Sequence, residues 1–256
     1  MMNYTKGKTV MDDELKRNIK YLGLPGLVDD WPVYLQEAEK KRLNNDKFLQ
    51  FIINKICEKK REHARVSRIN RAKIPEKYVI EAFPFSRQPK LAKQKLLGIY
   101  ESFSYMNEHQ SIIWIGQTGV GKTGLATSFL MNTLERGYSG RFVLFNDLIE
   151  ELYRAVADGS SKKVLKAYSA YDCLLIDEMG YVETDRGQLG LFFRLLQARH
   201  KRKTTLITTN LGFGEWCGFL KNEQMTAALI DRLTETSHVF NMKGCQSLRP
   251  KNLELD

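Results

Sequence analysis

The stretch GQTGVGKTGLATSFLM occupies residues 116–131 and decides how the rest of the sequence is interpreted. It follows the apolar run SIIWI (111–115), and its second half has the apolar spacing of a helix. Two glycines separated by four residues and followed by Lys122 and Thr123 are typical of a loop that turns backbone N–H groups towards a phosphate. The start of the helix adds a partial positive charge. The sequence therefore predicts a strand, a phosphate-binding loop and a helix in succession.

The chemistry of this loop assigns a role to each polar side chain. Lys122 is expected to reach the β- and γ-phosphates of a nucleotide, and the Thr123 hydroxyl is expected to bind Mg²⁺. A chance match in a glycine-containing turn is the alternative, and the strand before the loop and the helix after it argue against that alternative. The predicted nucleotide-binding residues of the loop are Gly116, Gln117, Thr118, Gly119, Val120, Gly121, Lys122, Thr123 and Gly124.

A second motif, YDCLLIDEMG (171–180), places two carboxylates after four apolar residues. Ligands of open α/β sheets bind at the carboxyl ends of strands, where Asp177 and Glu178 are expected. Asp177 is predicted to hold Mg²⁺ through water, and Glu178 is predicted to orient an attacking water. An ordinary loop start is the alternative, and it loses weight beside a phosphate loop. A second carboxylate favours hydrolysis over transfer to an acceptor.

A third motif, LITTN (206–210), ends an apolar run in polar residues. If this run is a strand of the same sheet, Asn210 lies close enough to the γ-phosphate to sense it. The alternative is an asparagine that caps the following loop, which is a common role for this residue type. The motif alone does not separate the two interpretations.

The alternation of short apolar runs with helical stretches predicts an α/β fold whose parallel sheet is covered on both faces. Helices are expected to begin near Lys122, Asp147, Asp185 and Lys221. The five expected strands are SIIWI (111–115), RFVLF (141–145), CLLID (173–177), TTLITT (204–209) and HVFNM (238–242).

The first part of the chain has a different pattern. Residues 12–72 are predicted to be helical, with a break at Pro25 and Gly26 and a second helical stretch from about Pro32 to Arg71. Three prolines between residues 75 and 89 indicate a linker. The predicted organisation is a helical N-terminal domain (1–74), a proline-containing linker (75–90) and a nucleotide-binding domain (91–256).

Composition restricts the class of protein. The chain of 256 residues contains no apolar run of about 20 residues and no apolar segment typical of a secretory signal near its start, so we expect a cytoplasmic protein without a membrane span. Its four cysteines are far apart and form no CxxC pair, which argues against a zinc site and indicates a reducing compartment. Ordinary thiols are the expected interpretation.

The net charge of +10 indicates a polyanionic partner. Residues 1–80 carry 18 Lys and Arg against 11 Asp and Glu, so most of the excess lies outside the nucleotide-binding domain. The stretch KKREHARVSRINRAK (59–73) spaces its arginines to line one helix face, which favours contact with the backbone of double-stranded DNA without sequence preference. A solvated charged face is the alternative. The candidate DNA-binding residues are Arg61, Arg65, Arg68 and Arg71.

Taken together, the motifs make the chain resemble the IstB-type transposition helper ATPases, members of the AAA+ superfamily related to the bacterial replicative helicase loader. The resemblance covers nearly the whole chain, and the order and spacing of its blocks are specific. The blocks are LGLPGLVDDW, FLQFIINKICEKKR, EAFPFS, GQTGVGKT, LLIDEMGY, TTN with FGEW, AALIDRL and KGCQSLRPK.

The resemblance implies further roles. It matches Lys122 and Thr123 to the Walker A motif, Asp177 and Glu178 to the Walker B motif, and Asn210 to sensor 1. It places adenine near Phe85. The implied cofactors are ATP and Mg²⁺, and the implied fold is the five-stranded AAA+ sheet with a minimal or absent C-terminal lid, because only about 14 residues follow the last predicted strand.

Two arginines are assigned by the resemblance. Arg232, in IDRL, matches the arginine finger that acts on the nucleotide of a neighbouring subunit, and a surface ion pair with Asp231 or Glu235 is the alternative. Arg249, in SLRPK, matches the sensor 2 arginine, and a solvated terminal arginine is the alternative. Gln117 and Gly124 depart from the proline and histidine more frequent in the family, and neither removes a phosphate ligand.

The resemblance implies an ATPase that assembles on DNA as a homo-oligomer, deforms it and delivers it to a transposase. One alternative is a replicative helicase loader, with a helicase as partner. Another is an ATP-gated DNA-binding scaffold with little turnover. A small-molecule kinase is unsupported, because no lid arginines or acceptor pocket are visible in the sequence.

Overall fold

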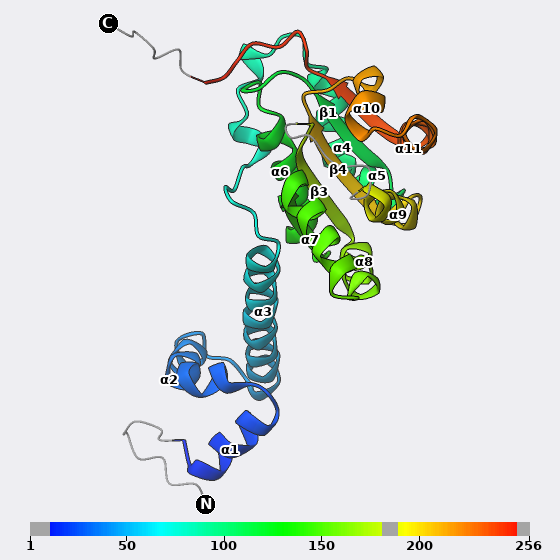
Figure 1. The fold of residues 1–256 in the computed structure, drawn as a ribbon. Helices are drawn as coiled ribbons and strands as arrows, with labels where there is room; N and C mark the ends of the chain where they lie inside the picture. The colour runs from blue at the N-terminus through cyan, green and yellow to red at the C-terminus, as the bar shows by residue number, and fades with distance from the viewer. Residues whose placement is uncertain (1–10, 181–188, 250–256) are drawn as a thin grey trace, which may run out of the picture. The chain divides into compact units, whose positions relative to one another are not determined.

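The structure, a computed structural model, describes residues 11–180 and 189–249 (Figure 1). The chain forms two compact units, residues 1–66 and residues 67–256, and each is described by itself. The boundary between them falls inside α3 (Asn45–Arg71), a helix of 27 residues. In the part of the chain that the structure describes, no helix is both long enough and apolar enough to span a bilayer.

The first unit is helical and contains α1 (Asp13–Tyr21), α2 (Pro25–Lys40) and the first part of α3. The carboxylate of Asp12 caps α1 by accepting a hydrogen bond from the N–H of Leu15 at 2.6 Å. Pro25 begins α2, a position where the missing N–H of proline has no helical partner to lose. Local capping therefore sets where both helices start.

The predicted helical stretch from Pro32 to Arg71 is wrong in its boundaries. Pro32 lies inside α2, and the chain turns between α2 and α3 at Arg42, whose φ is 49°. The side chain of Asn44 then accepts a hydrogen bond from the N–H of Lys47 at 2.9 Å, at the start of α3. The break is a turn followed by a cap, which the spacing of apolar residues did not reveal.

The second unit is built on a five-stranded, all-parallel sheet in the order β2-β3-β4-β1-β5, which confirms the predicted α/β fold. The central strands are almost entirely buried, as their continuous apolar sequences require. The strands are β1 (Ser111–Ile115), β2 (Gly140–Leu144), β3 (Cys173–Met179), β4 (Thr204–Thr209) and β5 (Ser237–Asn241).

Helices cover both faces of this sheet, and successive residues of β1 point into different cores (Figure 1). Trp114 belongs to the core that includes residues of α4, α5 and α6, whereas Ile113 belongs to the core that includes residues of α7 to α11. The helices are α4 (Lys93–Ser102), α5 (Ser104–Asn107), α6 (Lys122–Glu135), α7 (Phe145–Ala157), α8 (Ser161–Ala170), α9 (Leu189–Arg199), α10 (Phe213–Leu220) and α11 (Glu223–Glu235).

The predicted helix starts at Lys122, Asp147 and Lys221 lie within two residues of the observed starts of α6, α7 and α11. The expected start at Asp185 lies outside the described residues. Four helices, α4, α5, α8 and α10, were not predicted. The sequence of α10 contains two glycines, which have low helix propensity, and its Trp216 is fully buried, so packing stabilises a helix that propensity disfavours.

The proline-containing segment 75–90, expected to be a linker, packs within the second unit. It contains two short 3₁₀ helices, η1 (Ile80–Ala82) and η2 (Phe85–Arg87). Ile80 is buried in the core beside α6, and Gln88 is only 1% exposed. The prolines therefore shape a segment that covers the nucleotide-binding domain.

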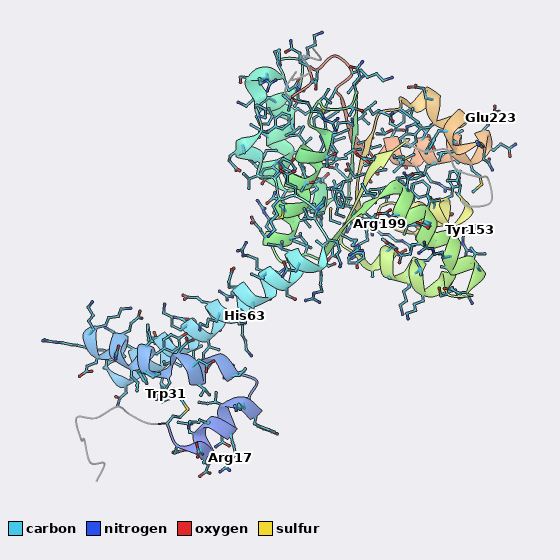
Figure 2. All side chains as sticks on the ribbon, turned by 60° about the vertical axis from the view of Figure 1, so that its left-hand side comes forward. Arg17, Trp31, His63, Tyr153, Arg199 and Glu223 are labelled. Atoms are coloured by element: carbon cyan, nitrogen blue, oxygen red, sulfur yellow. The ribbon has the colours of Figure 1, made fainter. Side chains whose placement is uncertain are left out.

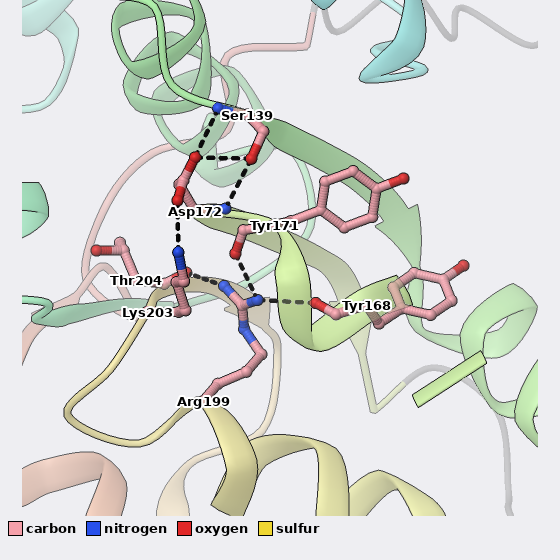
Figure 3. A network of polar contacts seen from close by, with 7 residues as sticks. All are labelled: Ser139, Tyr168, Tyr171, Asp172, Arg199, Lys203 and Thr204. Atoms are coloured by element: carbon pink, nitrogen blue, oxygen red, sulfur yellow. Dashed lines mark hydrogen bonds and ion pairs between the residues drawn. The ribbon is translucent and has the colours of Figure 1, made fainter. Parts of the chain in front are cut away.

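A buried arginine connects the helices to the sheet. Arg199, at the end of α9, lies within the second unit, whereas Tyr153 and Glu223 lie on its surface (Figure 2). The guanidinium of Arg199 donates hydrogen bonds to the carbonyls of Tyr168 and Tyr171, both at 2.8 Å, and to the carbonyl of Thr204 (Figure 3). Burial lowers its pKa to about 10, so the side chain stays charged at neutral pH.

A second polar cluster adjoins this arginine. The carboxylate of Asp172 accepts hydrogen bonds from the N–H and the hydroxyl of Ser139, at 2.9 and 2.7 Å, and from Lys203 at 2.6 Å (Figure 3). These contacts join the segments that precede β2, β3 and β4. The cluster thus aligns the strands at the edge of the sheet opposite to their carboxyl ends.

Candidate functional site

The loop between β1 and α6 depends on two glycines with left-handed backbones. Gly119 has a φ of 84° and Gly121 a φ of 96°, angles that disfavour any side chain. Space also excludes a side chain, because a Cβ on Gly119 would stand 2.6 Å from the Ser247 hydroxyl and one on Gly121 would stand 2.6 Å from the Phe83 ring. The loop is therefore enclosed by residues from both ends of the second unit.

Lys122, the first residue of α6, lies beneath this loop. It is 6% exposed, and its ammonium donates hydrogen bonds to the carbonyls of Gly116 at 2.8 Å and Gln117 at 2.9 Å. Burial lowers the pKa of Lys122, and the nearby carboxylates of Asp177 and Glu178 partly oppose that effect. The side chain thus holds a positive charge in a poorly solvated position, suited to a polyphosphate.

Asp177 and Thr123 meet at the carboxyl edge of the sheet. The Thr123 hydroxyl lies 3.1 Å from each oxygen of the Asp177 carboxylate, and Asp177 is 2% exposed. Burial raises the pKa of Asp177, and the hydrogen bonds from Thr208 and Thr123 act in the opposite direction. A hydroxyl beside a desolvated carboxylate fits Mg²⁺, which prefers oxygen ligands and retains several waters.

Glu178 follows in an unusual conformation. Its φ is 60°, a strained value for a residue with a side chain, and it coincides with an irregularity in the pairing of β3 with β4. The Thr208 hydroxyl accepts a hydrogen bond from the N–H of Glu178 at 3.0 Å and donates one to Asp177. Strain of this kind clusters at functional sites, where it directs a side chain.

Sequence reasoning did not identify Thr208 as a site residue. Its only signal was its place at the end of a strand beside Asn210, and the choice between the polar residues of LITTN depends on which of them contacts β3. The structure brings Thr208 to the two acidic residues, so Thr208 joins the candidate site.

Lys122, Thr123, Glu178 and Thr208 line a cavity of about 430 Å³, whereas Asp177 is not among the lining residues and contacts the site through the Thr123 hydroxyl. Part of its wall comes from the segment 78–84, which precedes α4, and part from Leu248 and Arg249 near the end of the chain. The predicted residues that line the cavity are Thr118, Gly119, Gly121, Lys122, Thr123, Gly124, Glu178 and Arg249. The volume and the mixture of apolar and charged walls suit a nucleotide.

Comparison with known proteins agrees with this geometry. The family described as IstB-like ATP binding proteins matches residues 17–255. The chain belongs to this family. The matched residues include the glycine loop, Asp177 and the segment that carries Arg249, so the family match covers the whole candidate site. The resemblance that the motifs predicted is therefore confirmed.

Relatives of this IstB-like protein span nearly its full length. A protein of Geobacillus stearothermophilus, whose name describes it as an ATP-binding protein of insertion sequence IS5376, is 28% identical over 245 residues, 95% of this chain and 97% of that protein. A protein similarly named for insertion sequence IS21, from Pseudomonas aeruginosa, is 29% identical over 210 residues, 82% of this chain and 79% of that protein.

Solved structures show the fold of this IstB-like protein in replication proteins. The DnaC helicase loader is 24% identical, with a TM-score of 0.51 over 59% of this chain and 88% of its own. The replication initiator DnaA, bound to AMPPCP and single-stranded DNA, is 17% identical, with a TM-score of 0.55 over 66% of this chain and 51% of its own. Both likenesses concern the fold alone.

Other predicted residues of the IstB-like chain lie off the cavity wall. Gly116 and Gln117 contribute carbonyls to Lys122, and Val120 is buried. Phe85 packs edge-on against Phe83 at 4.8 Å between ring centroids, and Phe83 is the one of the two that lines the cavity. The segment expected near adenine is thus present, with a different ring facing the cavity.

Asn210 and Arg232 are also outside the lining of this cavity. The Asn210 side-chain oxygen is buried and finds no hydrogen-bond partner among the described residues. Arg232, on α11, lines a different cavity of about 280 Å³ together with Arg199 and His200. The alternative, a surface ion pair of Arg232 with Asp231 or Glu235, is not found among the described residues. The Glu235 carboxylate binds Lys201 at 2.5 Å and approaches His200 at 3.5 Å.

The candidate DNA-binding arginines differ in their contacts. Arg65 pairs with Glu62 at 2.8 Å in the first unit. In the second unit, Arg68 donates to the Leu134 carbonyl at 3.1 Å and Arg71 to the Ser67 hydroxyl at 2.8 Å. Arg61, in the first unit, is exposed. Three of the four arginines therefore have structural contacts of their own.

The opposite environments of Asp177 and Asp172 predict opposite effects of removing their charges. Asp177→Asn should raise the free energy of unfolding in neutral, metal-free buffer, because burial raises the pKa of Asp177 and the folded state disfavours its charge. Urea denaturation measures the difference. A variant that is less stable than the parent would contradict this account of the site.

Asp172→Asn serves as the control with the opposite sign. Burial raises the pKa of Asp172, but the hydrogen bonds from Lys203 and Ser139 outweigh burial, so its folded-state pKa lies below the ordinary value of 3.8. The ionised carboxylate therefore stabilises the fold above 3.8, and this contribution is lost as the pH falls through the folded-state pKa. The variant should be less stable than the parent at neutral pH, and the difference should shrink in acid.

Proposed function

We propose that this protein is an ATPase that assembles on DNA with ATP and Mg²⁺ and helps a transposase to use its target DNA. The observation that carries the proposal is that the glycine loop, Lys122, Thr123 and Glu178 line one cavity, with the Asp177 carboxylate in contact with the Thr123 hydroxyl. Names of relatives that span nearly the whole chain, all ATP-binding proteins of insertion sequences, support transposition as the setting.

Each group has a role in hydrolysis. The loop N–H groups and Lys122 hold the β- and γ-phosphates, and Thr123 and Asp177 hold Mg²⁺, which neutralises phosphate charge when bound. Glu178 orients the attacking water, and its conformation, supported by Thr208, keeps the carboxylate at the cavity. Arg249 adds positive charge at the wall. The separation of metal-binding and water-orienting carboxylates is what favours hydrolysis over transfer.

A helicase loader remains the second candidate, and the structural likeness to DnaC concerns the fold alone. Relatives named for insertion sequences and matched over 82–95% of this chain favour transposition. The ATP-gated scaffold differs from both in turnover, so measuring hydrolysis separates it from them.

The first test separates binding from hydrolysis. Lys122→Ala should abolish Mg²⁺-dependent ATP binding, because the variant lacks the charge that faces the phosphates. Glu178→Gln should still bind ATP while turnover falls by about 100-fold or more, as expected for the loss of a general base. Equilibrium binding and phosphate release measure the two effects.

Glu150→Gln, an exposed carboxylate on α7, is the matched control and should leave turnover unchanged. If Glu178→Gln hydrolyses ATP at the parental rate, Glu178 does not orient the water. If the parent binds ATP with negligible turnover on DNA, the scaffold function replaces the ATPase.

Arg232 is proposed to act on the nucleotide of a neighbouring subunit. It is exposed on α11 and does not line its own chain's loop cavity, which is compatible with action in trans. Arg232→Ala should lose ATPase activity and retain ATP binding. Mixing it with Lys122→Ala subunits should restore part of the activity, at interfaces that pair an intact loop with an intact arginine.

Arg194→Ala removes an exposed arginine from α9 and should change neither property. If co-assembled mixtures of the two inactive variants stay inactive, Arg232 does not act between subunits.

Double-stranded DNA is proposed to contact residues 1–80 through its phosphate backbone, because most of the excess positive charge lies there, and Arg61 and Arg65 are the candidate contacts within the first unit. Changing Arg61 and Arg65 to Ala should reduce the salt slope of DNA affinity by about one unit for each lost phosphate contact, on unrelated sequences alike. Removing these arginines spares the contacts of Arg68 and Arg71 with the rest of the second unit.

The control removes two exposed charges from the second unit, Arg154 and Lys162, and should leave the slope unchanged. If only the control variant lowers the slope, the DNA surface lies on the ATPase domain. If the loss with Arg61 and Arg65 is confined to one DNA sequence, these arginines read bases and binding is not sequence-tolerant.

A further inference from the structure

The end of the described chain crosses the phosphate loop. After β5, the N–H of Leu248 donates a hydrogen bond to the carbonyl of Gly119 at 2.8 Å. A Leu248 methyl carbon lies 3.0 Å from where a Cβ on Gly121 would stand, and the Arg249 side chain lies 3.4 Å from the corresponding position on Gly119. We define residues 243–249 as the C-terminal strap, which covers both left-handed glycines of the loop.

One buried side chain bonds to the strap and to the loop. The Gln88 amide nitrogen donates hydrogen bonds to the carbonyl of Val120 at 3.2 Å and to the carbonyl of Gln246 at 2.6 Å. Its amide oxygen accepts a hydrogen bond from the N–H of Gln246 at 3.0 Å. Gln88 is 1% exposed, so both of its donor hydrogens and its acceptor are used where water has little access.

The groups around Gln88 require the side-chain amide, because they include both acceptors and a donor. A side chain of similar volume without polar atoms would leave the Val120 carbonyl and both backbone groups of Gln246 without this partner, and unmet buried groups are costly. A carboxylate would keep the acceptor but would set its oxygens against two carbonyls. Arg87 adds a longer contact to the carbonyl of Ser247, at 3.4 Å.

The strap also carries a charge into the cavity. Arg249 lines the cavity together with Lys122, and its backbone N–H donates to the Ser247 hydroxyl at 3.3 Å. The Ser247 hydroxyl packs against Gly119, so the position of the strap on the loop determines where the Arg249 guanidinium lies. The position of Arg249 therefore depends on a residue that precedes the glycine loop by about thirty residues.

We propose that Gln88 is a positioning residue that fastens the C-terminal strap to the phosphate loop and thereby couples nucleotide binding to the seating of Arg249. The proposal rests on the proposed ATP-binding function of the cavity. Because coupling between two events is reciprocal, a seated strap tightens ATP binding and bound ATP protects the strap. Gln88 touches no phosphate in this scheme and acts through Val120 and the strap.

The test uses Gln88→Met in the full chain, with Gln94→Met as the matched control because Gln94 is exposed on α4. Hydrogen–deuterium exchange of the Gln246 and Leu248 amides, without nucleotide, should be at least about tenfold faster in Gln88→Met, since the bonds that protect them are weakened. The control should match the parent. Unchanged exchange in Gln88→Met would overturn the proposal.

A second measurement separates positioning from general damage. ATP affinity is compared for the parent, Gln88→Met, Arg249→Ala and the double variant. If Gln88 acts through the strap, each single change should weaken ATP binding by about 5- to 30-fold, and the double variant should be no weaker than the weaker single variant. Losses that multiply would show that the two residues act separately and would overturn the proposal.

If Gln88→Met does not fold, Gln88→Glu replaces it, because the carboxylate keeps the volume and the acceptor for the Gln246 N–H while losing both donors. It should show intermediate exchange at Gln246. A parent that binds no ATP would overturn the proposed function and with it the coupling, whereas amide exchange would still report whether Gln88 holds the strap.

Discussion

The desolvated carboxylate of Asp177 is the constraint on which the architecture of this site depends. It lies at the carboxyl end of β3 and is held by hydroxyls from two other elements, Thr123 of α6 and Thr208 of β4. Keeping a charge there requires the loop, the central strands and α6 to be placed accurately, since misplacing any one of them removes a hydrogen bond from a buried anion. The geometry of the site therefore depends directly on the packing of the central strands.

The sheet provides that accuracy because it is buried on both faces. Alternating residues of β1 enter two separate cores, so a shift of one residue would exchange Ile113 and Trp114 between the two cores. At the opposite edge, Arg199 and Asp172 satisfy backbone groups and align the strands through polar contacts. Apolar packing determines the register of the strands, and polar clusters at the two edges of the sheet fix the positions of the strand ends.

The cavity reflects a balance between stability and chemistry. Burial lowers the pKa of Lys122 and raises that of Asp177, so both charges are held in positions that cost folding energy. Glu178 adds a strained backbone. The surrounding elements offset these costs. They include the segment before α4, which the prolines suggested was a linker, and the C-terminal strap, which bonds to the phosphate loop.

The sequence alone determined the local features. The glycine loop, the apolar strands and the acidic strand end could be predicted because each depends on residues close together in the chain: left-handed angles need glycine, and buried parallel strands need continuous apolar runs. The order of these features along the chain also predicted the five-stranded sheet and the family. The turn between α2 and α3 and the helices α4, α5, α8 and α10 were missed, and in α10 packing of Trp216 outweighed the low propensity of two glycines.

Tertiary structure decided what depends on distant segments. Sequence spacing could not show that Thr208 hydrogen-bonds to Asp177 and Glu178 of β3, or that Phe83 rather than Phe85 lines the cavity. It also could not show that Arg68 donates to the carbonyl of Leu134, 66 residues away. Nor could it show that Gln88 bonds to a backbone 158 residues away. Each of these outcomes depends on which side chains the folded second unit brings close together. Those distances are set by the packing of the whole unit, because no local pattern encodes the partner of a buried polar atom.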